Sequence, residues 1–237
     1  KLVLKAFILS AGLGTRLRPV TNFLPKALVP IDGKPLLQYW LENLTGAGVD
    51  QFLINVHYKS ETIKAFLVKS TYKHMVKIVK EDFLLNTGGS LLSNKDFFDR
   101  DPFMLIHGDN LCLCDFREFI AAHKKRPSGC VITMMLFYSD NPVDCGIVEL
   151  DEQGIVRQFH EKVKNPPSNL ANAAVYICEY SIFSFLEDLN KRQIDFSNDV
   201  LPNYLGKIST YINTSYHRDI GTIESYALAQ VEILQYK

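Results

Sequence analysis

The feature that most constrains this chain is a short apolar run near the N-terminus that ends in two closely spaced glycines. Residues 6–9 are apolar, and Gly12 and Gly14 follow within the next few positions. Because glycine has no Cβ, the backbone N–H groups of such a turn can approach an anion closely. Arg16 and Lys26 place positive charge beside the turn, and a guanidinium can pair with two phosphate oxygens at once. The stretch therefore predicts a site for a polyphosphate.

Two familiar glycine loops fit this stretch badly. The P-loop ends in Gly-Lys-Ser/Thr, which is absent here, and the dinucleotide fingerprint needs a third glycine where this chain has Leu17. Pro19 also argues against a helix that begins directly after the turn. These departures disfavour a nicotinamide-dependent oxidoreductase.

Composition excludes several other classes of protein. The chain has 237 residues with 26 basic and 26 acidic side chains, so no net basic charge attracts nucleic acid or an anionic membrane. No apolar run approaches the roughly 20 residues of a membrane-spanning helix. The first twelve residues look superficially like a signal peptide, but Lys5 interrupts them, and we interpret them as a buried strand. The five cysteines lack the spacing of a disulfide framework or a zinc site. We therefore expect reduced thiols and a cytoplasmic protein.

Apolar runs alternate with helical patterns through the first half, which predicts an α/β fold with a mostly parallel mixed sheet and helices on both faces. The second half adds a β-hairpin around the turn at residues 151–154. We expect one domain over 1–237, with halves of about 1–115 and 116–237. The predicted strands are 7–10, 52–56, 75–79, 103–106, 131–137, 145–150, 155–159, 173–178 and 208–213, and the predicted helices are 35–47, 61–69, 181–189 and 222–234.

Residues 11–36 read AGLGTRLRPVTNFLPKALVPIDGKPL. This combination resembles the sugar-1-phosphate nucleotidyltransferases, whose pattern is G-x-G-T-R-x-x-P-x-T followed by P-K-x-L-x-P-x-x-G-K-P, and mannose- or heptose-1-phosphate guanylyltransferases in particular. The resemblance implies a three-layer Rossmann-like fold. It also implies Mg²⁺-dependent transfer of a nucleotidyl group from a nucleoside triphosphate to a sugar 1-phosphate, with release of pyrophosphate.

The resemblance also implies roles for single residues. The catalytic charges would be Arg16, Lys26, Asp109 and Lys162, and the metal ligands Asp109 and Asp219. The nucleotide would contact Leu9, Ala11, Gly12, Gly14, Thr15, Thr87 and Gly88. The sugar phosphate would contact Asn110, Gly146, Glu161, Lys162 and Asn172. On this account the carboxylates of Asp109 and Asp219 should lie close together.

The sequence departs from the family pattern at three places on the sugar side. Val163 replaces the proline that follows Glu-Lys, Ala174 replaces a glycine, and Gly146 lacks the tyrosine that precedes it in the family. Several of the motifs, taken alone, also have a purely structural interpretation. Residues 86–90 read as a turn, Asp109 as a strand-end turn residue, and Thr222 as the cap of the last helix.

The choice of substrates stays open at this point. The Thr-Gly-Gly sequence at residues 87–89 resembles guanylyltransferases, which favours GTP, and also uridylyltransferases, but it is less like thymidylyltransferases. A uridylyl-, cytidylyl- or thymidylyltransferase of the same family stays the alternative. A non-catalytic nucleotide-sugar sensor could use the same fold. The expected partners are the triphosphate and the sugar 1-phosphate, without nucleic acid or membrane, and a homodimer is left open.

Overall fold

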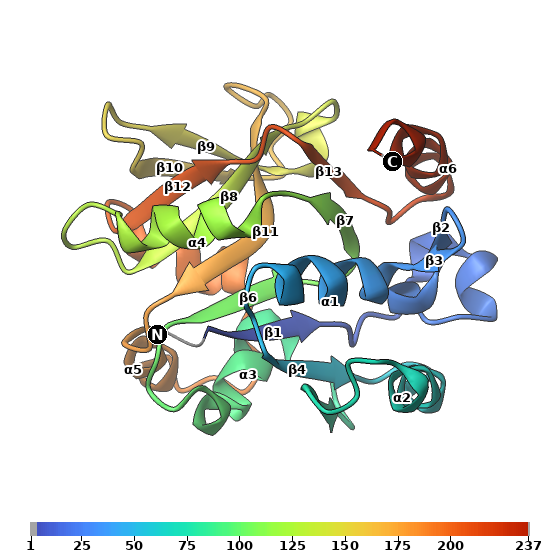
Figure 1. Ribbon diagram of the computed structural model, residues 1–237. Helices are drawn as coiled ribbons and strands as arrows, with labels where there is room; N and C mark the ends of the chain where they lie inside the picture. The colour runs from blue at the N-terminus through green and yellow to red at the C-terminus, as the bar shows by residue number, and fades with distance from the viewer. Residues whose placement is uncertain (1–3, 237) are drawn as a thin grey trace. The chain divides into compact units, whose positions relative to one another are not determined.

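The computed structural model describes residues 4–236, and its contacts divide the chain into two compact units whose elements are labelled in Figure 1. Unit 1 comprises described residues 4–84, 106–114 and 215–236, and unit 2 comprises 85–105 and 115–214. The last segment of the chain, which the sequence analysis grouped with the second half, thus belongs to unit 1. The prediction of one domain stays a prediction.

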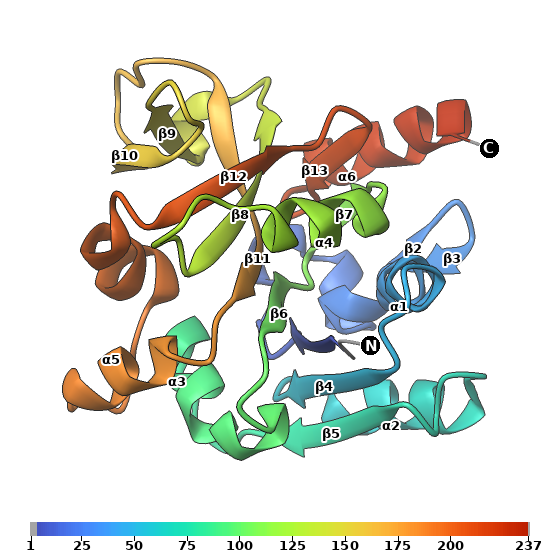
Figure 2. The same ribbon diagram turned by 60° about the vertical axis from the view of Figure 1, so that its left-hand side comes forward.

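The centre of unit 1 is a parallel sheet that buries continuous apolar runs. Strands β1, β4 and β5 lie side by side in that order, β1 beside β4 in Figure 1 and β4 beside β5 in Figure 2. Leu9 lies opposite Asn55, and Asn55 lies opposite Val79. Helices α1 and α2 connect these strands, since parallel neighbours need a crossover connection that is usually a helix. The bounds are β1 (Lys5–Leu9), α1 (Leu36–Gly46), β4 (Gln51–Val56), α2 (Ser60–Lys69) and β5 (Val76–Lys80).

Short strands and the last helix complete unit 1. Strand β13 pairs antiparallel with β7, which places Asp219 opposite Asn110. Tyr226 and Gln230 of the last helix both donate hydrogen bonds to the Pro30 carbonyl, at 2.6 and 2.7 Å. The bounds are β2 (Pro30–Ile31), β3 (Lys34–Pro35), β7 (Asn110–Leu113), β13 (Tyr216–Asp219) and α6 (Ile223–Glu232), while β6 (Phe103–His107) contributes residues to both units.

The strands of unit 2 are mixed in direction and pair in the order β10-β9-β11-β8-β12. Strand β11 pairs antiparallel with β8, β12 pairs parallel with it, and β9 and β10 form the hairpin (Figure 2). Asp115 caps the N-terminus of helix α4, because its carboxylate accepts hydrogen bonds from the backbone N–H groups of Arg117 and Glu118. The bounds are α3 (Asn86–Ser93), α4 (Phe116–Lys124), β8 (Ile132–Tyr138), β9 (Gly146–Leu150), β10 (Val156–Glu161), β11 (Leu170–Cys178), α5 (Ile182–Asp188) and β12 (Ile208–Ile212).

The predicted α/β architecture and the hairpin are both present. The sequence analysis did not predict α4, β7 or β13. None of the five cysteines forms a disulfide, and Cys112, Cys130 and Cys178 are buried. Across residues 4–236, every helix falls short of the length and apolar character needed to cross a bilayer.

Candidate active site

The glycine turn after β1 is held by the segment that follows it. Gly14 has a φ of +62°, and a Cβ there would lie 2.9 Å from Cγ2 of Thr21, so a larger residue would be strained and would collide. The Thr21 hydroxyl donates to the Gly14 carbonyl at 2.7 Å, and the Tyr58 hydroxyl donates to the Thr21 carbonyl at 3.1 Å. Thr21 is 1% exposed. It therefore ties the turn to the rest of unit 1, a role that the sequence analysis missed.

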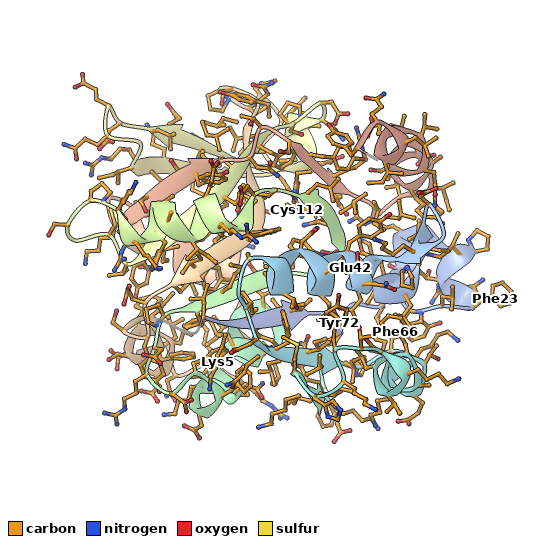
Figure 3. All side chains as sticks on the ribbon, in the orientation of Figure 1. Lys5, Phe23, Glu42, Phe66, Tyr72 and Cys112 are labelled. Atoms are coloured by element: carbon orange, nitrogen blue, oxygen red, sulfur yellow. The ribbon has the colours of Figure 1, made fainter. Side chains whose placement is uncertain are left out.

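No α-helix starts after the turn, in agreement with the argument from Pro19. Three short 3₁₀ turns follow instead, at Thr15–Leu17, Val20–Asn22 and Lys26–Leu28. Leu17 is fully buried and anchors the first of them, while Phe23, labelled in Figure 3, is 79% exposed at the outside of the segment. Gly12 is exposed, and a Cβ placed on it would meet no atom within 4 Å. The space beside Gly12 is thus open.

Lys26 joins two carboxylates that are far apart in sequence. Its Nζ donates to Oδ2 of Asp109 at 3.0 Å and to Oδ1 of Asp219 at 3.1 Å. The Lys26 side chain is 9% exposed, whereas the carboxylate-bearing side chains of Asp109 and Asp219 are 48% and 55% exposed. The ammonium therefore lies at the inner end of the group, and oxygens of both carboxylates remain accessible.

The backbone explains how the two carboxylates come together. Asp109 lies in the turn between β6 and β7, and the N–H of the adjacent Gly108 donates to the Leu9 carbonyl at the end of β1, at 3.0 Å. Asp219 is the last residue of β13, which pairs with β7. Nη2 of Arg16 lies 3.7 Å from Oδ2 of Asp219. Four of the predicted site residues, Arg16, Lys26, Asp109 and Asp219, thus form one cluster in unit 1.

Electrostatic interactions within the cluster favour the charged forms of Lys26 and Asp109. Desolvation alone would lower the pKa of Lys26, but the charges of Asp109 and Asp219 outweigh it and raise the pKa above its ordinary value. Desolvation likewise opposes ionisation of Asp109, yet the Lys26 ammonium holds the pKa of that carboxyl below its ordinary value. Within residues 4–236 no group of three or more histidine, cysteine, aspartate or glutamate side chains gathers as a metal site. Asp109 and Asp219 are a pair of oxygen donors, accompanied by a lysine.

Three predicted sugar-phosphate residues of unit 2, namely Gly146, Glu161 and Lys162, lie on the hairpin or directly after it. Glu161 lies opposite Gly146 across β10 and β9, and Nζ of Lys162 is 3.6 Å from Oε1 of Glu161. Lys162 has a φ of +50°, so the chain turns sharply at this point although Val163 stands where the family has proline. Burial raises the pKa of the Glu161 carboxyl, and Lys162 lowers it only in part.

Asn172 is held by its own strand. Its Nδ2 donates to the Tyr176 hydroxyl at 2.6 Å, and its Oδ1 accepts the N–H of Ala174 at 2.9 Å. Ala174 has a φ of +54° and lies where the register of β11 shifts against β8. The left-handed conformation that suits the family's glycine is therefore kept here by an alanine.

The segment at residues 86–90 corrects an expectation. The predicted turn is instead the first part of helix α3. A Cβ on Gly88 would lie 2.7 Å from Cγ2 of Ile194, and one on Gly89 would lie 2.6 Å from the Arg192 carbonyl oxygen. The hydroxyl of Thr87 accepts the N–H of Phe196 at 2.8 Å. The close approach that these glycines permit is thus to residues 192–196 of the chain itself, and the predicted role of Thr87 and Gly88 in nucleotide binding stays a prediction.

Comparison with known proteins gives this cluster its context. The sequence profile of the family described as nucleotidyl transferase matches residues 5–236. The chain belongs to the nucleotidyl transferase family.

Relatives within the nucleotidyl transferase family differ in their named substrates. The chain is 29% identical over 235 residues to the mannose-1-phosphate guanylyltransferase of Mycobacterium tuberculosis, a match that covers 97% of this chain and 64% of that protein. The chain thus spans less than two thirds of that relative. HddC from Yersinia pseudotuberculosis, solved as a complex with GMP-PN, is 27% identical with a TM-score of 0.81, over 97% of this chain and 99% of that one.

A further solved structure shows the fold of the family at greater sequence distance. A putative glucose-1-phosphate thymidylyltransferase from Bacillus anthracis matches with a TM-score of 0.87 at 21% identity, over 97% of this chain and 94% of that one. The predicted Rossmann-like α/β fold is confirmed by this likeness. The roles predicted for single residues of this nucleotidyl transferase remain expectations.

Proposed function

We propose that this chain transfers a nucleotidyl group from a nucleoside triphosphate, GTP in the first place, to a mannose- or heptose-like sugar 1-phosphate. The observation that carries the proposal is the shared position of Lys26, Asp109 and Asp219 beside the open glycine turn. The guanylyltransferase name of one relative and the GMP-PN complex of another support GTP. The thymidylyltransferase name of a third keeps other bases in the test.

In the proposed reaction a sugar phosphate oxygen attacks the α-phosphorus. A new P–O bond forms, the bond between the α-phosphorus and the bridging oxygen to the β-phosphate breaks, and pyrophosphate leaves with the electron pair. The attacking oxygen is already ionised at neutral pH, so no general base is required. Such transfers depend mainly on positioning and on compensation of negative charge.

The cationic side chains would supply that compensation. Arg16, whose side chain is 68% exposed, would hold the β- and γ-phosphates and then the leaving pyrophosphate. Lys26 would contact the α-phosphate, where negative charge builds, and Lys162 would bind the phosphate of the attacking sugar. Glu161 and Asn172 would accept or donate hydrogen bonds to sugar hydroxyls.

The residues present fit a magnesium ion. Mg²⁺ prefers oxygen ligands, is commonly bound by one or two carboxylates, and completes its shell with water and substrate phosphates. Asp109 and Asp219 already face one positive charge, the Lys26 ammonium, and keep exposed oxygens. A bound Mg²⁺ would neutralise charge on the triphosphate as pyrophosphate departs.

The test is a pyrophosphate-release screen of ATP, GTP, CTP, UTP and dTTP against a panel of sugar 1-phosphates with Mg²⁺. We expect turnover with GTP and a mannose- or heptose-type 1-phosphate. Turnover with another base only would overturn the substrate assignment, and no turnover with any pair would overturn the activity.

Arg16→Ala is the matching variant test of the assigned roles. We expect it to slow pyrophosphate release by about a hundredfold while the KM of the sugar 1-phosphate changes little, because Arg16 is assigned to the leaving group. Arg117→Ala, at the exposed start of α4, serves as the control. Parent turnover in Arg16→Ala would contradict the assignment.

A further inference from the structure

A chain of side-chain hydrogen bonds crosses the carboxyl ends of three parallel strands in unit 1. The backbone N–H of Ser10, directly after β1, donates to Oδ1 of Asn55 in β4 at 2.7 Å. Nδ2 of Asn55 donates in turn to Oε1 of Glu81, directly after β5, at 2.8 Å. These hydrogen bonds therefore reach Ser10, the residue directly before the glycine turn.

The groups that Asn55 contacts fix the orientation of its side-chain amide. Asn55 is 2% exposed and Glu81 is 6% exposed. With the amide of Asn55 reversed, its NH₂ group would face the Ser10 N–H and its oxygen would face a carboxylate, so both hydrogen bonds would be lost. The Glu81 backbone is also fixed, because its N–H donates to the Val56 carbonyl at 2.9 Å and its carbonyl lies 2.7 Å from Nδ1 of His57.

Stability alone does not account for a carboxylate at this place. Among the described residues, Oε2 of Glu81 and Oγ of Ser10 are buried without a hydrogen-bond partner. A buried carboxylate satisfied by so few donors opposes folding, and apolar side chains of similar volume often replace such groups without loss of stability. What the network does provide is a fixed position for the Ser10 N–H.

We propose that Glu81 and Asn55 are positioning residues for the nucleotide, with Glu81 acting through the Asn55 amide on Ser10. This inference rests on the proposed function and on the expectation, stated from the sequence, that backbone N–H groups of the glycine turn bind the triphosphate. Glu81 holds the Asn55 amide, Asn55 holds the Ser10 N–H, and the glycine turn starts from a fixed point. Loss of these two hydrogen bonds loosens the glycine turn and weakens nucleotide binding. The sugar-phosphate residues of unit 2 are unaffected.

The chain of bonds can be broken and then rebuilt in the opposite sense. Asn55→Asp keeps the acceptor for Ser10 but sets a second carboxylate against Glu81, so the two side chains repel. Adding Glu81→Gln supplies an amide donor toward the new carboxylate and restores an unbroken chain with its second bond reversed. We expect Asn55→Asp to raise the KM of the triphosphate about tenfold or more, equivalent to about 1.4 kcal/mol, and the double variant to return it most of the way.

Two further readouts separate positioning from general damage. The KM of the sugar 1-phosphate should stay at the parent value in both variants, and hydrogen exchange of the Ser10 amide should speed up in Asn55→Asp and slow again in the double variant. Asn213→Asp, at a buried asparagine of unit 2, is the matched control and should leave the triphosphate KM unchanged.

The outcomes distinguish this inference from the proposed function. Absence of nucleotidyl transfer in the parent protein would overturn the function itself. If the parent protein is active, two results would overturn the positioning role of Glu81. One is an unchanged triphosphate KM in Asn55→Asp, and the other is a double variant whose triphosphate KM is no better than that of Asn55→Asp.

Discussion

At the scale of single residues, Lys26 shows how a buried charge can serve a site. Its stem is almost fully buried, and an ammonium without partners at that depth would be costly. The carboxylates of Asp109 and Asp219 accept hydrogen bonds from this ammonium. Both of their side chains are about half exposed, so water partly screens the attraction between each carboxylate and Lys26. Lys26 therefore holds the two carboxylates together while both of their side chains stay about half exposed.

Ala174 allows a residue-scale prediction about stability. An L-residue in the left-handed region costs about 1–2 kcal/mol, and glycine avoids that cost but loses about 0.5–1 kcal/mol through the entropy of the unfolded chain. Ala174→Gly should therefore raise the free energy of unfolding, by about 0.5–1 kcal/mol. Urea denaturation of the parent and the variant measures the difference.

The matched control for that prediction lies in the same strand. Ala171 is fully buried in β11 and is not among the residues with positive φ, so Ala171→Gly should destabilise the protein. Equal loss of stability in both variants would show that the conformation of Ala174 carries no strain.

Single residues also show where sequence reasoning ends. Arg16 and Lys26 could be selected because positive charge beside a glycine turn points to phosphate chemistry, and Asp109 and Asp219 because their motifs resemble those of the family. The anchoring of the turn by Thr21, and the left-handed φ of Lys162 and Ala174, could not be predicted, because they depend on neighbours that only folding supplies. The glycines at residues 88 and 89 could be selected, but their packing against residues 192–196 could not be predicted, because tight packing on the chain and an approach to a ligand require the same residue type.

At the scale of elements, the pairing of β7 with β13 is what brings the two aspartates together. Glu232 of α6 holds β13 through hydrogen bonds. Its carboxylate accepts hydrogen bonds from Nε and Nη2 of Arg218 at 2.7 and 2.9 Å and from the Tyr216 hydroxyl at 2.7 Å. Tyr216 and Arg218 are alternate residues of β13, so both point to the same face of the strand. The helix thus clamps the strand that ends in Asp219.

Removing the charge of this clamp should weaken the fold of unit 1. The Arg218 and Glu232 side chains are 15% and 29% exposed, so their charged hydrogen bonds are only partly screened. We expect Glu232→Gln to lower the free energy of unfolding by about 1–3 kcal/mol. Thermal or urea denaturation measures this, with Glu224→Gln on the exposed side of the same helix as a control expected to stay within about 0.5 kcal/mol. If the two variants lose the same amount, the clamp contributes nothing specific.

The packing of α4 on β8 in unit 2 predicts a dependence of stability on pH. Burial, with the nearby Arg126 charge, lowers the pKa of His123 to about 3. Its Nδ1 contacts Thr133 at 2.7 Å and its Nε2 contacts Glu179 at 3.2 Å. The unfolded histidine has a pKa near 6.5, so between the two values the unfolded state binds a proton that the folded state does not. The buried neutral His123 therefore costs no free energy of unfolding above about pH 6.5, and it lowers the free energy of unfolding progressively as the pH falls below that value.

The measurement is the free energy of unfolding from pH 7 to pH 4.5 for the parent and for His123→Gln. Well below pH 6.5 the parent should lose about 1.4 kcal/mol per pH unit more than the variant, which has no imidazole to protonate. Parallel curves would contradict the assignment of a neutral, buried His123.

Most of the longer elements were predictable from their apolar pattern, although the nine-residue helix α4 was not predicted. The long apolar strands and the helices of strong periodicity could be placed from sequence, because burial on a sheet imposes those patterns. Strands β7 and β13 have four residues each, and β13 reads Tyr-His-Arg-Asp, so neither carries a recognisable strand pattern. Both form because they pair with each other, which is a long-range contact.

At the scale of the whole molecule, the proposed roles divide between the two units. Unit 1 holds the glycine turn and the cluster of Lys26, Asp109 and Asp219, to which we assign the triphosphate. Unit 2 holds Glu161, Lys162 and Asn172, to which we assign the sugar phosphate. The cytoplasmic location, the quaternary state and the magnesium requirement stay predictions.

The most direct test of the account is a double-mutant cycle on pyrophosphate release, with GTP, mannose 1-phosphate and saturating Mg²⁺. If Asp109 and Asp219 serve one cation site, Asp109→Asn and Asp219→Asn should each reduce turnover by about a hundredfold or more, and the double variant should be little worse than either. Asp50→Asn, at an exposed residue of unit 1, should turn over like the parent. Parent-like turnover in either single variant, or losses that multiply in the double variant, would contradict a shared site.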